Sequence, residues 1–186
     1  MLQVAAIVVV LLCWVIWSAA FFKPSRQSKG QQKVVRAPSS RWGILLQTIG
    51  FACAWMYVRP AGFAKSTPAL AASMILAPLA VALGWAAAHN LGKQWRYEAA
   101  LSKDHDLIRT GPYKWIRHPI YASMLGMLLA SLAAWTWWPM AIASLLFFLA
   151  GTEVRVHAEE RLLADRFQAE FAQYRKSTWA YIPFIR

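Results

Sequence analysis

The sequence has few acidic residues and few cysteines, and it lacks the glycine-rich motifs of soluble nucleotide-binding proteins. Its 186 residues include 8 Asp or Glu against 20 Lys or Arg, and the only two cysteines are Cys13 and Cys53. Both cysteines lie in apolar runs and belong to no CxxC or other metal-ligand spacing, so we interpret them as small buried hydrophobic residues. The 9 glycines nowhere form GxG. This excludes a Rossmann fingerprint and a P-loop.

Common catalytic and metal-binding motifs are also missing. The sequence contains no HExxH motif and no Ser-His-Asp signature. Its four histidines share no helical spacing that would place two of them on one metal ion, so we predict no metal site. These histidines are His89, His105, His118 and His157.

Apolar and aromatic residues are abundant instead: 59% of the chain is hydrophobic, and 11 residues are tryptophan. Soluble domains contain roughly 45–50% apolar residues, so this composition indicates a membrane protein. The formal net charge of +12 would by itself suggest a nucleic-acid partner. The charges, however, fall in blocks between long apolar runs, which is the arrangement that membrane topology requires. We therefore predict membrane lipid as a partner and no nucleic acid.

Five apolar segments approach the length of a membrane-spanning helix, which is about 20 residues. The first contains no charge and no small-residue cleavage site, so we interpret it as a retained helix and not as a signal peptide. Pro78 predicts a kink in the third. The last two are short, and the Trp-Thr-Trp-Trp-Pro sequence between them indicates a tight interfacial turn, so they form an antiparallel hairpin. The predicted spans are Leu2–Phe22, Gly43–Val58, Ala69–Leu91, Pro119–Ala134 and Pro139–Thr152.

The distribution of basic residues predicts the orientation. Eighteen of the 20 Lys and Arg residues follow spans one, three and five, and only Arg59 and Lys65 lie on the other side. Cytoplasmic loops carry the excess of basic residues, so we predict that the amino terminus lies outside an inner or cell membrane and the carboxyl terminus lies in the cytoplasm. All 8 acidic residues also lie on or next to the cytoplasmic side, and we expect any chemistry to take place there.

After span five, apolar residues recur with a helical period between charges. This pattern predicts a cytoplasmic amphipathic helix that continues from span five and lies against the membrane or the protein. The predicted fold is therefore all-α: a polytopic integral membrane protein with about five transmembrane helices. We expect a single membrane-embedded domain, 1–186. The periodic apolar residues are Val156, Leu162, Leu163, Phe167, Phe171 and Tyr174.

Two polar segments adjoin the predicted hairpin: the first polar segment is Leu107–Tyr121 and the second is Glu153–Leu163. Ionisable groups are costly next to lipid, so they favour a functional interpretation. The first could instead be an interfacial anchor. In the second, Arg155 and Glu159 are four residues apart and share a helix face. We interpret Glu160 and the charges after it as a solvated run, and Glu153 as a possible partner for an arginine.

Together these segments resemble the two signature segments of the isoprenylcysteine carboxyl methyltransferase family. The resemblance rests on Gly-x-Tyr, then Arg-His-Pro-x-Tyr, then a Glu-Glu pair, a Phe/Tyr-spaced tail and a closing Pro-Phe-Ile, and it covers roughly the second half of the chain. Arg-His-Pro-x-Tyr alone also resembles membrane phospholipid methyltransferases and sterol reductases. Ser123 stands where the family often has Gly. The small number of spans is similar to that of prokaryotic members.

The resemblance implies S-adenosylmethionine as cofactor, with S-adenosylhomocysteine as product, bound by the half of the chain from 92 to 186. The first three spans, 1–91, would then be scaffold. It also implies that Arg155 faces the acceptor, and that Glu159 holds the amino group of the cofactor and belongs with Arg155 to the catalytic residues. The other implied cofactor-binding residues are His105, Asp106, Leu107, Ile108, Gly111, Tyr113, His118, Pro119, Ile120 and Tyr121.

The residues themselves suit this chemistry. A carboxylate such as Glu159 suits the ammonium of the cofactor, and a helix start suits its carboxylate. Aromatic rings suit the adenine and the sulfonium. We predict methyl transfer to the carboxylate of an isoprenylated or lipid-like acceptor, which needs alignment rather than a general base. Three alternatives remain: a phospholipid-type N-methyltransferase, an NADPH-dependent sterol-type reductase, and a non-enzymatic membrane scaffold.

Overall fold

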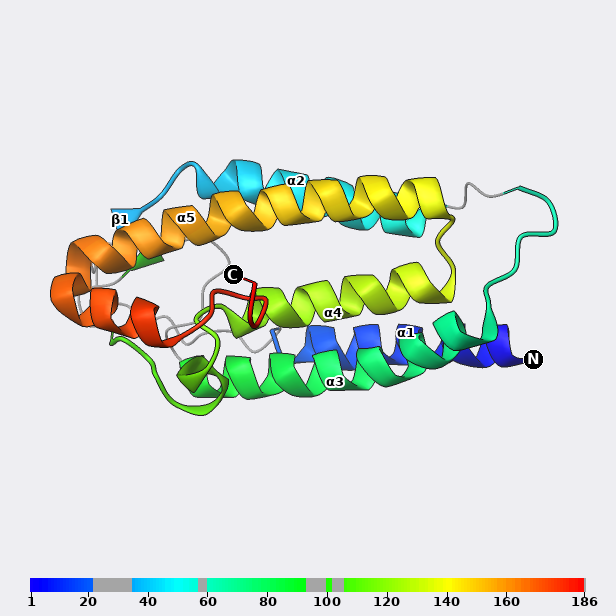
Figure 1. The fold of residues 1–186 in the computed structure, drawn as a ribbon, viewed down its shortest axis with the longest axis horizontal. Coiled ribbons are helices and arrows are strands. Elements are labelled where there is room, and N and C mark those ends of the chain that lie inside the picture. The colour runs from blue at the N-terminus through cyan, green and yellow to red at the C-terminus, as the bar shows by residue number, and fades with distance from the viewer. Residues whose placement is uncertain (22–34, 57–59, 93–99, 102–105, 186) are drawn as a thin grey trace.

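The computed structural model describes residues 1–21, 35–56, 60–92, 100–101 and 106–185 (Figure 1). Within these residues the chain forms five α-helices, one short 3-10 helix and a pair of two-residue antiparallel strands. The helices are α1 (Leu2–Ala19), α2 (Ser40–Trp55), α3 (Thr67–Leu91), η2 (Gly111–Lys114), α4 (Pro119–Ala134) and α5 (Trp138–Ser177), and the strands are β1 (Val35–Arg36) and β2 (Ala100–Leu101).

Three of the described helices, α1, α3 and α5, are long and apolar enough to cross a membrane, and α4 is a shorter apolar helix. This is the pattern of an integral membrane protein. Proline occupies the first turn of α3, α4 and α5, where its missing N–H is not needed. Pro78 lies within α3, yet the helix continues through it to Leu91.

The apolar segment predicted as the fifth span is the first part of a longer helix. Helix α5 continues through the second polar segment, so the region for which we predicted an amphipathic helix is part of the same element. Gln168 then interrupts the helix with φ 42° and ψ −114°. Figure 1 shows the consequence: the chain reverses at the end of α5, and its last part returns to the start of α4. We refer to Ala169–Ser177 as the returning limb.

The helices form two layers (Figure 1): α2 lies beside α5, and α1 and α3 lie beside α4. Helices α4 and α5 run antiparallel, as the predicted hairpin requires. However, α4 packs most extensively against α3, and α5 packs most extensively against α2. Glycine explains the closeness of α2 and α5. A Cβ on Gly151 would lie 2.6 Å from the carbonyl oxygen of Gly43. Between α4 and α5 the space is filled by larger side chains, including Leu128, Leu132 and Phe148.

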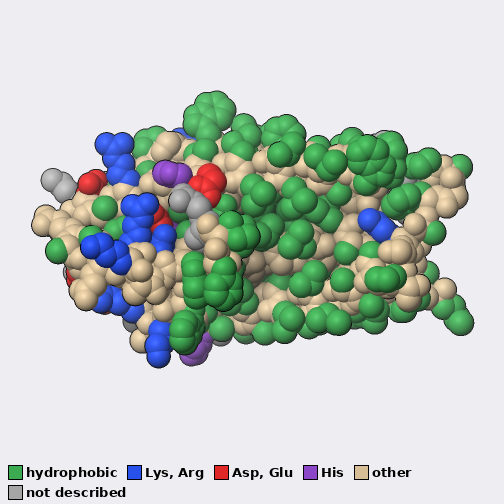
Figure 2. Space-filling model, viewed as in Figure 1, with side chains coloured by type: hydrophobic (Ala, Val, Ile, Leu, Met, Phe, Trp, Pro, Cys, Tyr) green, Lys and Arg blue, Asp and Glu red, His purple; other side chains and the backbone are tan. Residues whose placement is uncertain are grey.

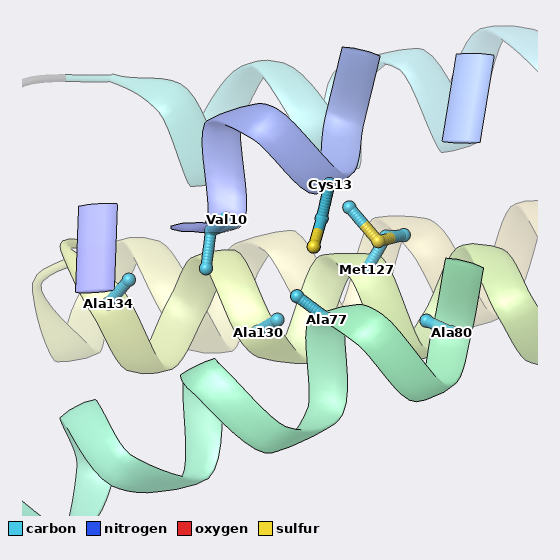
Figure 3. Packing of buried hydrophobic residues seen from close by; sticks show 7 residues of the cluster. All are labelled: Val10, Cys13, Ala77, Ala80, Met127, Ala130 and Ala134. Atoms are coloured by element: carbon cyan, nitrogen blue, oxygen red, sulfur yellow. The ribbon is translucent and has the colours of Figure 1, made fainter. Parts of the chain in front are cut away.

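The core that joins α1, α3 and α4 consists mainly of small side chains (Figure 3). Val10 and Cys13 of α1 meet Ala77 and Ala80 of α3 and Met127 of α4. Small residues let helix backbones approach closely, which suits packing within a membrane. Cys13 is thus the buried small residue that the sequence predicted. The same prediction is wrong for Cys53 of α2, which is only partly buried.

Indole–hydroxyl hydrogen bonds connect α1 to α4 inside this layer. The Nε1 of Trp14 donates to Ser131 Oγ at 3.0 Å, and the Nε1 of Trp17 donates to Ser123 Oγ at 3.2 Å. Ser123, which stands where the family often has Gly, is fully buried. Its hydroxyl gives Trp17 a hydrogen-bond partner that glycine could not provide.

Figure 2 shows that charged side chains gather at one end of the molecule, while apolar side chains cover most of the rest of this face.

Candidate functional site

The site lies at the charged end, where the residues before α4 meet the residues after α5. The backbone N–H groups of Arg117 and His118 donate to the carbonyls of Trp179 and Ala180, both at 2.8 Å, and the N–H of Trp179 donates to Trp115 at 3.1 Å. The carboxyl-terminal tail thus pairs in parallel with the segment that leads into α4. These bonds occupy the N–H groups of the two residues immediately before α4.

His118, the N-cap residue of α4, lies between two carboxylates of α5. Its Nδ1 is 3.3 Å from Glu159 Oε2, and its Nε2 is 3.5 Å from Glu160 Oε1. The imidazole is buried. Burial would lower the pKa of His118, but its close contacts with the carboxylates of Glu159 and Glu160 and their negative charges outweigh burial and raise the pKa above its ordinary value. The arrangement therefore favours an imidazolium between two carboxylates.

Tyr121 connects the same helix start to Glu159. Its hydroxyl donates to Glu159 Oε1, and its ring stacks with the His118 ring at a centroid distance of 5.7 Å and an interplanar angle of 24°. The Arg155 guanidinium carbon lies 4.9 Å from the centre of the Tyr121 ring. Glu159, Tyr121, His118 and Arg155 therefore form one cluster, and the structure brings together four of the residues that the sequence predicted for the site.

Tyr113 approaches this cluster from η2. It is buried, and its carbonyl accepts a hydrogen bond of 2.5 Å from the hydroxyl of Tyr174 on the returning limb. Burial raises the pKa of the Tyr113 phenol, and the negative charge of Glu159 raises it further. Gly111 precedes it with φ 59°, and a Cβ there would lie 2.4 Å from the Asn90 side chain. The positive φ therefore favours glycine at position 111, and a Cβ there would also displace the Asn90 side chain.

The remaining predicted residues take several positions. Pro119 is buried at the first position of α4, and Ile120 beside it is partly buried. Residues 106–108 have no regular secondary structure and lead toward η2, with Asp106 exposed and Leu107 and Ile108 partly buried. His105 lies outside the described residues.

Glu160 is the residue that the sequence interpretation placed wrongly. We expected a solvated charge, but only 8% of Glu160 is exposed. Arg117 Nε lies 2.9 Å and Arg175 Nε 3.5 Å from its carboxylate. Arg117 also donates to the carbonyls of Arg175 and Thr178. The periodicity of α5 could not reveal this burial, because the covering residues come from the returning limb and the tail.

Glu153 and Gln47 complete the polar groups around α5. Glu153 accepts a hydrogen bond of 2.7 Å from the Tyr181 hydroxyl, a partner that the sequence did not suggest. Gln47 of α2, which we had assigned to the scaffold, is 3% exposed. It accepts a hydrogen bond of 2.9 Å from Arg155 and donates one of 2.9 Å to Thr152. Its only signal in the sequence was its polarity within an apolar run.

A hollow of about 620 Å³ lies between the part of α5 that precedes Gln168 and the returning limb. On α5 its lining residues include His157, Arg161 and Ala164, whose spacing of four and three residues puts them on one helix face. Glu159 and Arg155 point from a different face of that helix. Among the described residues, no predicted cofactor-binding residue lines the hollow. It adjoins the cluster around Glu159 through Glu160, which lines the hollow and also contacts His118. The other lining residues are Glu160, Gln168, Phe171, Ala172, Arg175 and Lys176.

Comparison with known proteins agrees with this arrangement. The sequence profile of the isoprenylcysteine carboxyl methyltransferase (ICMT) family matches residues 72–165, which contain the cluster around Glu159 but neither α1 nor α2. The protein-S-isoprenylcysteine O-methyltransferase of Saccharomyces cerevisiae is 30% identical over 53% of this chain and 42% of its own length. The cobalt-zinc-cadmium resistance protein CzcN of Cupriavidus metallidurans is 35% identical over 44% of this chain and 37% of its own length.

The chain therefore spans less than half the length of these two curated relatives. The family match itself covers half of the chain and includes both polar segments entirely. Because the matched residues are also those that meet at the charged end of the molecule, sequence and geometry support the same conclusion. The chain belongs to the isoprenylcysteine carboxyl methyltransferase family.

Proposed function

We propose that the protein is an S-adenosylmethionine-dependent membrane methyltransferase whose acceptor is a carboxylate on an isoprenylated or lipid-like molecule. The observation that carries the proposal is the Glu159 carboxylate, held by Tyr121 and His118 at the start of α4 within the region that matches the family. A fixed carboxylate among aromatic rings, at one end of apolar helices, suits a cationic ligand and a lipophilic acceptor together.

The chemistry of this donor set fits the cofactor. S-adenosylmethionine supplies an electrophilic methyl group on a sulfonium. Glu159 would hold its ammonium, since a charge-assisted hydrogen bond is about twice as strong as a neutral one. The ring faces of Tyr113 and Tyr121 would accommodate the adenine or the sulfonium. His118 orients Glu159, and Gly111, Pro119, Ile120 and residues 106–108 would complete the walls.

Arg155 would orient the acceptor. A guanidinium can bind a carboxylate through two parallel hydrogen bonds, and its position over Tyr121 puts it next to the Glu159 cluster. A carboxylate is already ionised at neutral pH, so no residue has to remove a proton before transfer. The protein contributes alignment and exclusion of water, which can lower a barrier substantially by converting a bimolecular step into an effectively unimolecular one.

The proposed site faces the cytoplasm. Eighteen of the 20 basic residues lie on the predicted cytoplasmic side. In Figure 1 the amino terminus lies at the opposite end of the bundle from the bend of α5, as an external amino terminus requires. We propose about five spans in a single domain, with α4 and the apolar part of α5 as the last two, and with the cofactor bound by residues from 92 onward.

Calorimetry with purified protein tests the cofactor assignment. We expect S-adenosylhomocysteine to bind at micromolar concentration, and we expect Glu159→Ala to weaken binding roughly 10- to 100-fold, the range for a hydrogen bond to a charged group. The matched control is Glu170→Ala, which removes a carboxylate of α5 whose side chain is 57% exposed. The absence of heat with both S-adenosylmethionine and S-adenosylhomocysteine would refute the proposal.

The acceptor chemistry needs a second assay. Membranes that contain the protein would be incubated with S-adenosylmethionine labelled in its methyl group, and the labelled product would be treated with base. A base-labile label identifies a carboxyl methyl ester, as we propose. A base-stable label would place the methyl group on nitrogen, sulfur or carbon and would contradict a carboxylate acceptor.

A further inference from the structure

Gln47 connects α2 to the proposed acceptor-binding arginine through two buried hydrogen bonds. Its Oε1 accepts from Arg155 Nη1 at 2.9 Å, and its Nε2 donates to Thr152 Oγ1 at 2.9 Å. Both Gln47 and Thr152 are buried. A polar group in an apolar environment is costly unless it is hydrogen-bonded, so this side chain is held in place by both partners.

The hydrogen-bond pattern fixes which way the Gln47 amide points. The Thr152 hydroxyl donates its proton to the carbonyl of Phe148 at 2.8 Å. Its oxygen can therefore only accept from Gln47, which requires the amide nitrogen on that side. The amide oxygen must then face Arg155. Thr152 thus orients Gln47, and Gln47 in turn presents an acceptor to the guanidinium.

Close packing of α2 on α5 makes this contact possible. A Cβ on Gly43 would lie 2.4 Å from Arg155 Cγ and 2.7 Å from the carbonyl oxygen of Gly151. The aliphatic stem of Arg155 therefore crosses α2 at Gly43, one helical turn before Gln47. Beyond this point the guanidinium lies 4.9 Å from the centre of the Tyr121 ring. Helix α2 thus determines both the path of the stem and the position of the charged group.

We propose that Gln47 is a positioning residue for the acceptor: it holds the Arg155 guanidinium over Tyr121, where the acceptor carboxylate is to be aligned. This inference rests on the proposed function. It assigns a role to α2, which lies outside the family match at residues 72–165. On this proposal, the second of the first three spans supplies more than a scaffold.

The test separates acceptor alignment from cofactor binding. Gln47→Met keeps the length of the side chain and removes both hydrogen bonds, and Thr152→Val removes the group that orients Gln47. Thr48→Val is the control, because Thr48 is exposed on the same helix and its hydroxyl donates to the carbonyl of Ile44 within that helix. Each variant would be assayed for calorimetric affinity for S-adenosylhomocysteine and for KM and kcat with N-acetyl-S-farnesylcysteine, a small isoprenylated carboxylate.

We expect Gln47→Met to raise the KM for the acceptor roughly 10-fold or more, the effect of losing a hydrogen bond to a charged group. Thr152→Val should raise it less, and Thr48→Val should leave it unchanged. Affinity for S-adenosylhomocysteine should stay within about twofold of wild type in all three. An unchanged acceptor KM in both Gln47→Met and Thr152→Val would overturn the inference, as would a parallel loss of cofactor affinity.

The outcomes that would overturn the role of Gln47 are distinct from those that would refute the proposed function. Wild-type protein that binds no cofactor, or that binds it and methylates no isoprenylated carboxylate, would refute the proposed function before any variant is compared. Should Gln47→Met not fold, Thr152→Val still decides the question, because valine replaces threonine with nearly the same shape and leaves Gln47 in place.

Discussion

Removal of the Glu160 carboxylate should destabilise the protein far more than its position in a charged run suggests. Glu160→Ala leaves Arg117 without its carboxylate partner, and the side chains of the two residues are only 9% and 7% exposed. Breaking a buried ion pair by deleting one partner costs about 3–5 kcal/mol, because the remaining charge stays buried and uncompensated. His118 loses one of its two carboxylate neighbours as well.

The chain supplies a matched control for this change. Glu170 also pairs with an arginine, Arg109, but their side chains are 57% and 39% exposed. Pairs of that kind contribute about 0–1 kcal/mol. Glu170→Ala should therefore lower the free energy of unfolding by less than about 1 kcal/mol. Glu160→Gln should fall between the two, since an amide oxygen can still accept from Arg117 but carries no charge.

Unfolding by sodium dodecyl sulfate in mixed micelles, followed by tryptophan fluorescence, measures these differences. The double variant Arg117→Met with Glu160→Leu gives the sharpest comparison, because it removes both charges together. The double variant should lower the free energy of unfolding by less than the sum of the two single substitutions, although the carbonyls of Arg175 and Thr178 also lose a donor. Equal effects for Glu160→Ala and Glu170→Ala, or additive effects in the double variant, would refute the buried ion pair.

Two further predictions concern pH and helix packing. The pKa of folded His118 is raised above the value near 6.5 of an unfolded chain, so its contribution to stability is fully present below about pH 6.5 and is lost as the pH rises through the folded pKa. The stability difference between wild type and His118→Gln should therefore shrink from pH 5.5 to pH 9, and a difference independent of pH would contradict this. Gly151→Ala puts a Cβ 2.6 Å from the carbonyl oxygen of Gly43. It should lower the free energy of unfolding by about 1–3 kcal/mol, whereas Ala150→Val, on the exposed side of α5, should change it little.

The sequence predicted α4 with its observed limits, because proline marks its start and a tryptophan-rich turn follows its end. It also predicted that His118, Tyr121, Arg155 and Glu159 belong to one site. Periodicity placed Arg155 and Glu159 on one helix face, and the family resemblance joined them to the residues before α4. Helix boundaries, helix faces and motif spacing depend on residues that lie near one another in the sequence, so they can be predicted from the sequence alone.

The positions of Glu160 and Gln47 show what such relations leave out. In both cases the neighbouring residues in the sequence do not explain why the side chain is buried. Glu160 is buried because the chain reverses at Gln168 and brings Arg175 back to it. Gln47 reaches Arg155 because glycines let α2 approach α5 closely. Neither contact follows from helical periodicity, since periodicity says which face a residue occupies and not which element covers that face.

The sequence by itself thus determined that this is an all-helical membrane protein of the isoprenylcysteine carboxyl methyltransferase family, with its polar residues collected on one side. Composition, apolar run length and motif spacing carry that information, because burial in lipid and helix geometry act residue by residue. Only the tertiary structure decided that the carboxyl-terminal tail pairs with the start of α4 and that α5 packs on α2. Those contacts join residues more than 100 positions apart in the case of Gln47 and Arg155, and they depend on how whole helices fit together.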